Sequence, residues 1–560
     1  MSTMKRRLFL AILGALLLLV VFSYGWVPLR TSQDDWWHLK TGAWIVEHGS
    51  LPVYDIFTYT GADTVWYNHE WLSQVIFWLI YEHCGGLFGL LTFKAFWVAL
   101  TFAGVAWLSW RRCGVWVVAL VVAWLAAEIS RRGIYVRPPL FSYALFALYL
   151  GLFDAWKRSR LSGWVLAAVT VPLMILWANL HGMYLLGIVV CGAYCCGEFV
   201  EWCWRRRKGE TLPLRRVLFL CGLGVGFVLA ACVNPYGWKL FFLGSKFMND
   251  PYLSKVISEM QVSPFFLVKT SAGWSFIPGF FACWFTAALF VALLLWKRRL
   301  PSVADLLLSL FFLYQGLMHW RLLVLFGIAI SGPLSWLIVQ SLPRSESGRR
   351  RVLGAIGVVG GVLAMSMMTL VGEPPPQTFL RRNILLSHGE TMDAASYPEA
   401  VVRFIERADL PDNMFSPLNY CGYFMWRLAP EKHKLFTDNR FDIWGSKWWL
   451  EHEVILSASE KSENVLGKSW HELLDEHGVN FLVLNRDSQL HERLATDASH
   501  GGSDWAHIYY WIPPGEPVAG HGFSIWLRSN GIVDRSALVA KSLELFREEN
   551  PGRPLPSVVE

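Results

Sequence analysis

The sequence predicts a polytopic α-helical membrane protein with a smaller α/β domain at its C-terminal end. Hydrophobic residues make up 54% of the 560 residues and charged residues only 17%, whereas soluble proteins carry about 25% charged residues. Apolar runs of roughly 17 to 25 residues recur up to residue 371, and each is long enough to cross a bilayer core. A soluble domain therefore fits only after residue 371.

Charge divides the chain at nearly the same place. Residues 1–375 hold 32 Lys and Arg against 17 Asp and Glu, and residues 376–560 hold 18 against 26. The basic excess lies between the apolar runs, where Lys and Arg report orientation in a membrane. Membrane lipids are thus the expected partner of these charges, and nucleic acid is not.

Eleven spans follow from the apolar runs, at residues 8–28, 87–109, 114–130, 139–156, 162–179, 183–204, 215–233, 275–296, 301–319, 321–341 and 351–371. This arrangement places 21 of the 32 basic residues on one side, which we predict to be cytoplasmic. The chain is then expected in the cytoplasmic (inner) membrane, with its N-terminus inside and residues 376–560 outside. The first span lacks a small-x-small cleavage site, so we expect an uncleaved anchor.

The first outer loop, residues 30–86, is expected to lie along the membrane surface. Residues 70–83 are apolar but short, and a crossing there would turn the basic clusters outward. We predict amphipathic interfacial helices over residues 70–83 and 35–48. Trp36 and Trp37 are expected to anchor the loop at the interface.

Residues 376–560 have the pattern of a separate α/β domain. The segments "YPEAVVRFIERADL" and "SWHELLDEHGV" predict helices, whereas "HKLFTD", "NFLVLN", "HIYYWI" and "FSIWLR" predict short strands. Helices that alternate with strands favour a small α/β domain. The segment "GEPPPQ" at residues 372–377 predicts a stiff linker before it.

Polar residues that could carry chemistry collect at the predicted outer ends of the spans. They are the acids Asp34, Asp35, Glu70 and Glu259, the histidines His38, His181 and His319, and the cations Arg137 and Arg321. Acids beside aromatic residues at a membrane surface lose solvation, which raises their pKa and suits a general base. Lys94 lies about 10 Å inside the second span, and an ionisable group at that depth is a functional candidate. The structural alternatives are interface anchoring for the tryptophans, lipid contacts for Arg131 and Arg132, and turns at residues 179–182 and 234–237.

The opening segments "DDWWHLKTGAWIVEHGSLPVYDIFTYT" and "WYNHEWLSQVIFWLIYEHCGGLFGL" resemble the start of a known family. "RPPLFSYALFALYL", "WANLHGMYLLGI", "NPYGW" and "NYCGYFMWRLAPEKHKLFTDNRFDIWG" follow in the same order. The family consists of bacterial membrane proteins assigned to the GT-C glycosyltransferase superfamily, and the resemblance runs through most of the chain. The superfamily includes oligosaccharyltransferases and protein O-mannosyltransferases, whose first outer loop carries an essential acid.

The resemblance implies transfer of a hexosyl or pentosyl group from a polyprenyl-phosphate carrier to a glycan, lipid or protein acceptor of the cell envelope. It places the general base or acceptor-positioning acid on Asp34. Asp35 and Glu70 are further catalytic candidates. The family's start resembles D-P-D-x-W-W-H, and Ser32 stands here in place of the first acid. This departure weakens any metal site built from two acids.

The remaining candidates would bind the donor phosphate or the substrate. Arg137, Arg321 and Lys94 would hold the phosphate charge, because Arg can bind phosphate bidentately. The other predicted substrate-binding residues are His38, His181, Glu259 and His319. No soluble cofactor is needed, and a divalent cation such as Mg or Mn that bridges carboxylate and phosphate is an open alternative.

Two other classes of function remain open at this point. A lipid or sugar transporter would explain the spans and Lys94, but its polar groups should line both halves of the membrane. A non-catalytic protein that binds envelope polymer or assists assembly would explain the C-terminal domain, but it would not explain the acids of the first loop.

Overall fold

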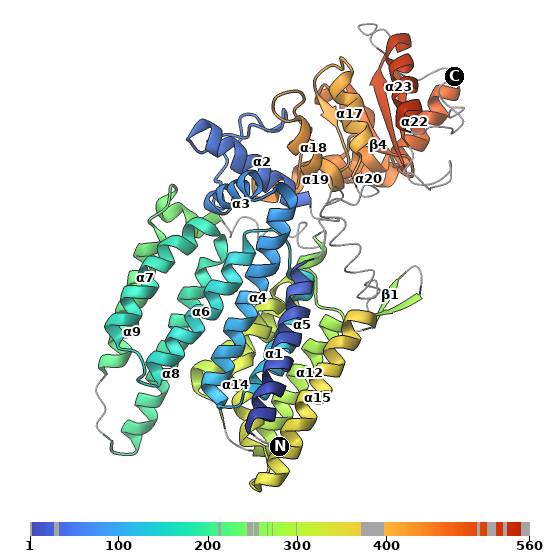
Figure 1. The fold of residues 1–560 in the computed structure, drawn as a ribbon. Helices are drawn as coiled ribbons and strands as arrows, with labels where there is room; N and C mark the ends of the chain where they lie inside the picture. The colour runs from blue at the N-terminus through green and yellow to red at the C-terminus, as the bar shows by residue number, and fades with distance from the viewer. Residues whose placement is uncertain are drawn as a thin grey trace. The chain divides into compact units, whose positions relative to one another are not determined.

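Figure 1 shows the chain as a computed structural model, which describes residues 3–26, 33–210, 214–243, 250, 257–265, 267–270, 273–297, 300–370, 397–500, 504–511, 522–529 and 535–549. The chain divides into two compact units. The helical unit comprises residues 1–27, 69–242 and 254–388, and the C-terminal unit comprises residues 28–68, 243–253 and 389–560. The sequence pattern assigns residues 30–86 to the membrane domain, whereas the structure joins residues 28–68 to the C-terminal unit. The predicted boundary at 375 and the linker at 372–377 lie outside the described residues.

The helical unit consists of long helices with short 3-10 turns and one hairpin. Its helices are α1 (Thr3–Gly25), α3 (Trp71–His83), α4 (Gly86–Cys113), α5 (Trp116–Ser130), α6 (Pro139–Lys157), α7 (Gly163–Leu180), α8 (Leu185–Arg207), α9 (Arg215–Ala231), α12 (Pro278–Lys297), α13 (Val303–Met318), α14 (Leu323–Gln340) and α15 (Glu346–Leu370). The 3-10 turns are Arg131–Gly133, Gly182–Tyr184, Gly237–Lys239, Ser258–Met260 and Trp320–Leu322. Strands β1 (Leu267–Thr270) and β2 (Gly273–Phe276) pair as an antiparallel hairpin.

Each predicted span overlaps one of these helices, and the chain is a multi-pass membrane protein. Within the described residues, seven helices are long and apolar enough to cross a membrane by length and composition, on α1, α4, α6, α7, α8, α12 and α14. Helices α5, α9 and α13 are shorter, with 15, 17 and 16 residues. The count of eleven spans therefore stays a prediction.

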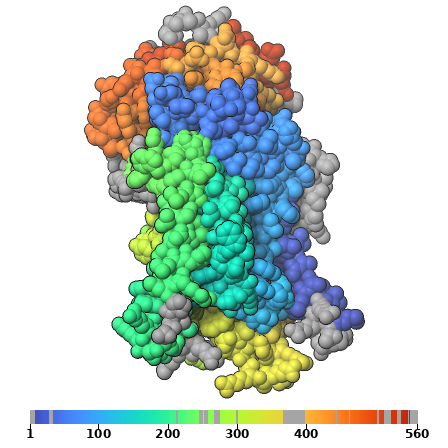
Figure 2. All heavy atoms as spheres, turned by 90° about the vertical axis from the view of Figure 1, so that its left-hand side faces the viewer, coloured from blue at the N-terminus to red at the C-terminus, as the bar shows by residue number. Residues whose placement is uncertain are grey.

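The flank formed by α7, α8 and α9 has an apolar outer surface. Helix α9 packs against both α7 and α8, and the teal and green part of Figure 2 shows this flank. Trp164, Val225 and Leu229 on these helices are exposed. Soluble proteins rarely expose large continuous apolar surfaces, whereas such side chains fit a surface that faces lipid.

A buried ion cluster joins three helices at one end of the helical unit. Arg112 in the last turn of α4 has Nη1 at 2.6 Å from Asp305 Oδ1 and Nη2 at 2.9 Å from Asp154 Oδ1. Asp154 lies near the end of α6, and Asp305 lies in the first turn of α13. Gly114, with a φ of 72°, ends α4 directly afterwards, because glycine adopts the left-handed conformation without strain. The ends of α4 and α6 therefore meet the start of α13.

The C-terminal unit is a small α/β fold. Its four strands are β3 (Met414–Phe415), β4 (Phe481–Asn485), β5 (Trp505–Trp511) and β6 (Phe523–Arg528), in the order β3-β4-β6-β5. Strand β3 runs parallel to β4, and the other two pairs are antiparallel. The helices are α2 (Gln33–His48), α17 (Glu399–Arg407), α18 (Leu418–Leu428), α19 (Phe441–Ser457), α20 (Glu460–Leu466), α21 (Trp470–Glu476), α22 (Gln489–Ser499) and α23 (Arg535–Glu549).

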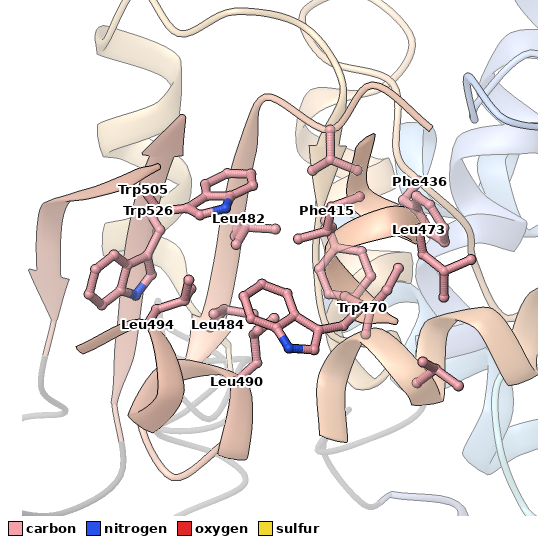
Figure 3. Packing of buried hydrophobic residues seen from close by; sticks show 14 residues of the cluster. Phe415, Phe436, Trp470, Leu473, Leu482, Leu484, Leu490, Leu494, Trp505 and Trp526 are labelled. Carbon is pink, nitrogen blue, oxygen red and sulfur yellow. The ribbon is translucent and has the colours of Figure 1, made fainter. Parts of the chain in front are cut away.

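Apolar side chains of the strands pack against α21 and α22 (Figure 3). Leu482 and Leu484 of β4 belong to one cluster with Trp470, the first residue of α21, and Leu490 in the first turn of α22. Ser469 and Glu472 form a capping box at the start of α21, which satisfies backbone N–H groups that lack helical partners. The alternation of helix and strand along the chain thus builds a core of its own.

The predicted elements of this domain are confirmed in part. Three predicted strands correspond to β4, β5 and β6, and the two predicted helices correspond to α17 and α21. The prediction of a strand over residues 433–438 is wrong, because only isolated bridges form there, from Leu435 to Thr58 and to Met414. Through Leu435, these bridges attach residues 33–68, which we call the opening loop, to the edge of the sheet.

Both predicted interfacial segments are helical, as α2 and α3, but α2 is built into the C-terminal unit. The ring of Trp36 is 1% exposed and lies 5.4 Å from the ring of Tyr397 and 5.2 Å from that of Tyr423. Large aromatic rings in edge-on contact contribute strongly to a core. Trp36 is therefore a core residue of the C-terminal unit, and not the interface anchor that the sequence pattern suggests.

A buried ion triad makes a second attachment of the opening loop. Arg440 Nη2 lies 2.6 Å from Asp55 Oδ1, and Arg440 Nε donates to Asp438 at 2.9 Å. All three side chains are buried. The guanidinium also lies over the rings of Phe57 and Trp66. Asp438 and Arg440 thus hold the loop to the domain.

Replacement of Arg440 by Met should loosen residues 50–66 from the domain. The change leaves two carboxylates buried without their cation, and breaking a buried pair costs about 3–5 kcal/mol. Hydrogen exchange reports this through the Tyr59 and Leu435 amides, which bond to the Leu435 and Phe57 carbonyls. Arg407→Met removes an exposed pair with Glu548 and is the control, since exposed pairs contribute about 0–1 kcal/mol. Unchanged protection in Arg440→Met would refute the attachment.

Candidate functional site

The two acids of the opening loop have different environments on α2. Asp34 is half-buried in the first turn and accepts a hydrogen bond from Trp37 Nε1 at 3.3 Å. A carboxylate in the first turn is stabilised by the positive end of the helix dipole. Asp35 is 1% exposed, and His38, one turn further along the same face, is also buried. Asp34 is therefore the acid of this pair with an accessible side chain.

A junction between α3 and α7 holds the third predicted acid. Trp71 Nε1 donates to Asn179 Oδ1 at 3.1 Å, and Ser73 Oγ donates to the Leu180 carbonyl at 2.6 Å. Directly before α3, Glu70 Oε1 lies 3.3 Å from His181 Nε2 and 3.8 Å from His69 Nε2. Segments far apart in sequence thus bring two histidines to one carboxylate.

A chain of hydrogen bonds selects the tautomer of His181. Trp177 Nε1 donates to Ser142 Oγ at 2.8 Å, and Ser142 Oγ lies 2.9 Å from His181 Nδ1. The Met183 backbone N–H also points at Nδ1, at 3.4 Å. Because a backbone N–H can only donate, Nδ1 acts as the acceptor and Nε2 carries the proton. The Nε2–H therefore faces Glu70.

The charge of His181 is suppressed by its surroundings. Burial holds the pKa of His181 well below its usual value, and the neighbouring His69 and Arg321 lower this pKa further. The imidazole is thus neutral at physiological pH, and its role towards Glu70 is that of a hydrogen-bond donor. The sequence pattern indicated His181 but not Ser142 and Trp177. These two residues lie within apolar runs and stand out there only because their side chains can form hydrogen bonds.

Two guanidiniums lie in the same part of the helical unit. Arg137 Nη1 lies 3.5 Å from Glu259 Oε1. Tyr143 interacts electrostatically with Arg137, Glu259 and Arg321, and Arg321 also acts on His181. We call Glu70, His181, Arg137, Glu259 and Arg321 the helix-end cluster.

The turns that carry this cluster are fixed by backbone contacts. His319 Nδ1 lies 2.8 Å from the Met260 carbonyl, and Ser263 Oγ donates to the Gly316 carbonyl at 2.6 Å. His319 therefore positions the segment that carries Glu259. On α6, Ser142 and Asp154 are twelve residues apart, or about 18 Å along a helix. The helix-end cluster and the Arg112 cluster thus occupy opposite ends of the helical unit.

The predicted site residues divide between the two units. Asp34, Asp35 and His38 belong to the C-terminal unit. The helical unit holds Glu70, Lys94, Arg137, His181, Glu259, His319 and Arg321, of which His319 contacts the segment beside Glu259 and five others form the cluster. Lys94 is 3% exposed within α4, and its role in phosphate binding stays a prediction. The described residues contain no group of three or more His, Cys, Asp or Glu that could hold a metal ion.

Comparison with known proteins gives a likeness of fold. No protein-family model and no curated protein matches the sequence. Among solved structures, the chain is similar to the archaeal oligosaccharyltransferase AglB from Archaeoglobus fulgidus, determined in complex with an inhibitory peptide and a dolichol-phosphate. The match has a TM-score of 0.56 and 13% sequence identity, and it covers 98% of this chain and 78% of that chain. The chain therefore shares the fold of this oligosaccharyltransferase, which agrees with the polytopic helical fold that the sequence predicted.

Proposed function

We propose that the chain is a membrane glycosyltransferase that transfers a sugar from a polyprenyl-phosphate carrier to an acceptor on the outer face of the cytoplasmic membrane. The observation that carries the proposal is the helix-end cluster, in which the neutral His181 contacts Glu70 and a second carboxylate, Glu259, pairs with Arg137. AglB, a solved structure of similar fold, was determined with dolichol-phosphate, which is itself a lipid phosphate.

The residues supply the groups that this reaction needs. The acceptor hydroxyl loses its proton to a carboxylate, the role that the sequence resemblance gives to Asp34, and its oxygen forms a bond to the anomeric carbon. The bond from that carbon to the phosphate oxygen breaks, and the electron pair leaves with the lipid phosphate. Arg137 and Arg321 stabilise the charge that develops on the phosphate.

No step of this reaction calls on a soluble cofactor. A divalent cation that bridges a carboxylate to the donor phosphate is an alternative way to hold the same charge. Glu70 and Glu259 are the carboxylates that the helix-end cluster offers for it.

The other two classes of function fit the geometry less well. A transporter should present polar groups to its cargo at both ends of the helical unit. Here the far end is occupied by Arg112, whose charge is matched by Asp154 and Asp305 at 2.9 and 2.6 Å. A purely structural envelope protein has no need for a histidine whose proton is directed at a carboxylate.

Replacement of Asp34 by Asn should lower turnover by about 10²–10⁴-fold, because the change keeps the size of the side chain and removes the base. Asp35→Asn, at the buried neighbouring position, should reduce turnover much less. Release of polyprenyl phosphate by purified variants in detergent measures both. Near-normal turnover in Asp34→Asn would exclude it as the base, and a loss in Asp35→Asn alone would transfer the role to its neighbour.

Replacement of Arg321 by Gln should lower kcat/KM for the donor by about 10- to 100-fold, since a hydrogen bond to a charged group contributes about 1.5–3 kcal/mol. Arg321→Lys should recover only part of the loss, because a lysine cannot bind phosphate bidentately. Arg158→Gln removes an arginine paired with Asp154 at the other end of α6 and is the control. Equal kinetics in the Arg321 and Arg158 variants would contradict the phosphate role.

The proposed topology predicts that the C-terminal unit lies outside the cytoplasm. A reporter active only outside, fused after residue 380, should be active, whereas the same reporter at residue 208 should be silent. The reverse pattern would invert the layout and with it the side on which transfer occurs.

A further inference from the structure

Glu70 is contacted by His181, whose tautomer is determined by hydrogen bonds to its other ring nitrogen. The side chain of Glu70 is 14% exposed and that of His181 is 8% exposed, so water screens their contact poorly. His181 Nδ1 is occupied by Ser142 and Met183, which leaves the Nε2–H for the carboxylate. Hydrogen bonds that are donated to a carboxylate favour its ionised form. The Nε2–H of His181 thus stabilises the carboxylate form of Glu70 in the helix-end cluster.

The charges of this cluster balance before any substrate binds. Arg137 and Arg321 are cations, Glu70 and Glu259 are anions, and His181 is neutral. Arg132, which precedes α6, is exposed and lies over the rings of Phe280 and Trp320, so water screens its charge. A polyprenyl-phosphate sugar brings one negative charge in its phosphodiester. A sugar that carried its own carboxylate would bring a second one.

We infer that Glu70, held by the Nε2–H of His181, selects donors whose sugar is uncharged or cationic and rejects acidic sugars such as uronates. The inference rests on the proposed function, since it concerns the sugar that the same cluster accepts. The two guanidiniums are needed for the phosphate, which leaves the carboxylates to face the sugar. Carboxylates accept hydrogen bonds from sugar hydroxyls, whereas a sugar carboxylate near Glu70 is repelled.

The size of the selection follows from Coulomb's law. Two like charges about 6 Å apart, at an effective dielectric of about 20, repel by almost 3 kcal/mol. This repulsion corresponds to a preference on the order of 100-fold in kcat/KM. In Glu70→Gln, which keeps the shape and removes the charge, the preference should fall by about tenfold or more.

The test compares two donors that differ in one group, polyprenyl-phosphate glucose and polyprenyl-phosphate glucuronate. The full-length protein in nanodiscs is given each donor, and release of polyprenyl phosphate yields kcat/KM. The wild-type protein should prefer glucose, and Glu70→Gln should lose most of that preference. The control is Glu201→Gln, since Glu201 pairs with Lys157 at the opposite end of α6, and it should keep the wild-type ratio.

The outcomes separate the selection from the proposed function. Equal use of the two donors by the wild-type protein, or an unchanged ratio in Glu70→Gln, would overturn the selection while transfer itself stands. Release of polyprenyl phosphate from neither of these donors, nor from other neutral or amino-sugar donors, would overturn the proposed function and the selection together.

A second measurement is independent of activity. Nitrogen chemical shifts of ¹⁵N-histidine-labelled protein, assigned by difference from His181→Gln, report the tautomer and charge of His181. The hydrogen bonds to Nδ1 require the proton on Nε2, and the lowered pKa of His181 requires a neutral ring at neutral pH. A ring with the proton on Nδ1, or one that titrates with the pKa of an exposed histidine, would remove the donor to Glu70 and overturn the inference.

Discussion

The constraint on which this structure depends is that a helix in lipid can place its charges only where they are paired or near its ends. Helix α6 shows the consequence most clearly, because Ser142 near its start joins the His181 network and Asp154 near its end joins Arg112. The residues of α6 between Ser142 and Asp154 are mostly apolar, so they pack against neighbouring helices or face lipid. Chemistry is thereby confined to the two ends of the helical unit, and the two ends differ in kind.

The two ends differ in how closely their charged side chains are paired. At the Arg112 end, one guanidinium is held between two carboxylates at short distances, which is an arrangement suited to holding helices together. At the other end, Arg137 and Glu259 lie further apart, at 3.5 Å, and each side chain is 22% exposed. A phosphate can compete for Arg137 there far more easily than it could for Arg112. The same physical rule thus produces a structural cluster and a candidate binding cluster.

Much of the fold could be predicted from the sequence, because it depends on local pattern. The apolar runs locate the helices, and the alternation around "NFLVLN" and "FSIWLR" locates β4 and β6. The attachment of the opening loop could not be predicted in this way. It depends on Trp36 against Tyr397 and on Asp55 against Arg440, and these pairs are separated by more than 350 residues. No periodicity encodes such contacts, so a loop that reads as a membrane-surface segment proves to be part of the C-terminal unit.

The candidate site shows the same division. Glu70, His181, Arg137 and Arg321 could be named because polar residues at span ends stand out against an apolar background. That Ser142 and Trp177 select the tautomer of His181 follows only from packing between α6 and α7. The sequence also offered no reason to prefer Asp34 to Asp35, beyond the resemblance, whereas burial separates an accessible acid from a buried one.

The proposed reaction breaks the bond between a sugar and a polyprenyl phosphate. The most direct measurement is mass spectrometry of the lipid fraction after the purified protein, in nanodiscs, has been incubated with polyprenyl-phosphate sugars and an extract of envelope acceptors. If the chain transfers the sugar, free polyprenyl phosphate accumulates and an acceptor gains the mass of one sugar. Donors that remain intact across neutral and amino sugars, when the protein is shown to be folded, would contradict the proposed reaction.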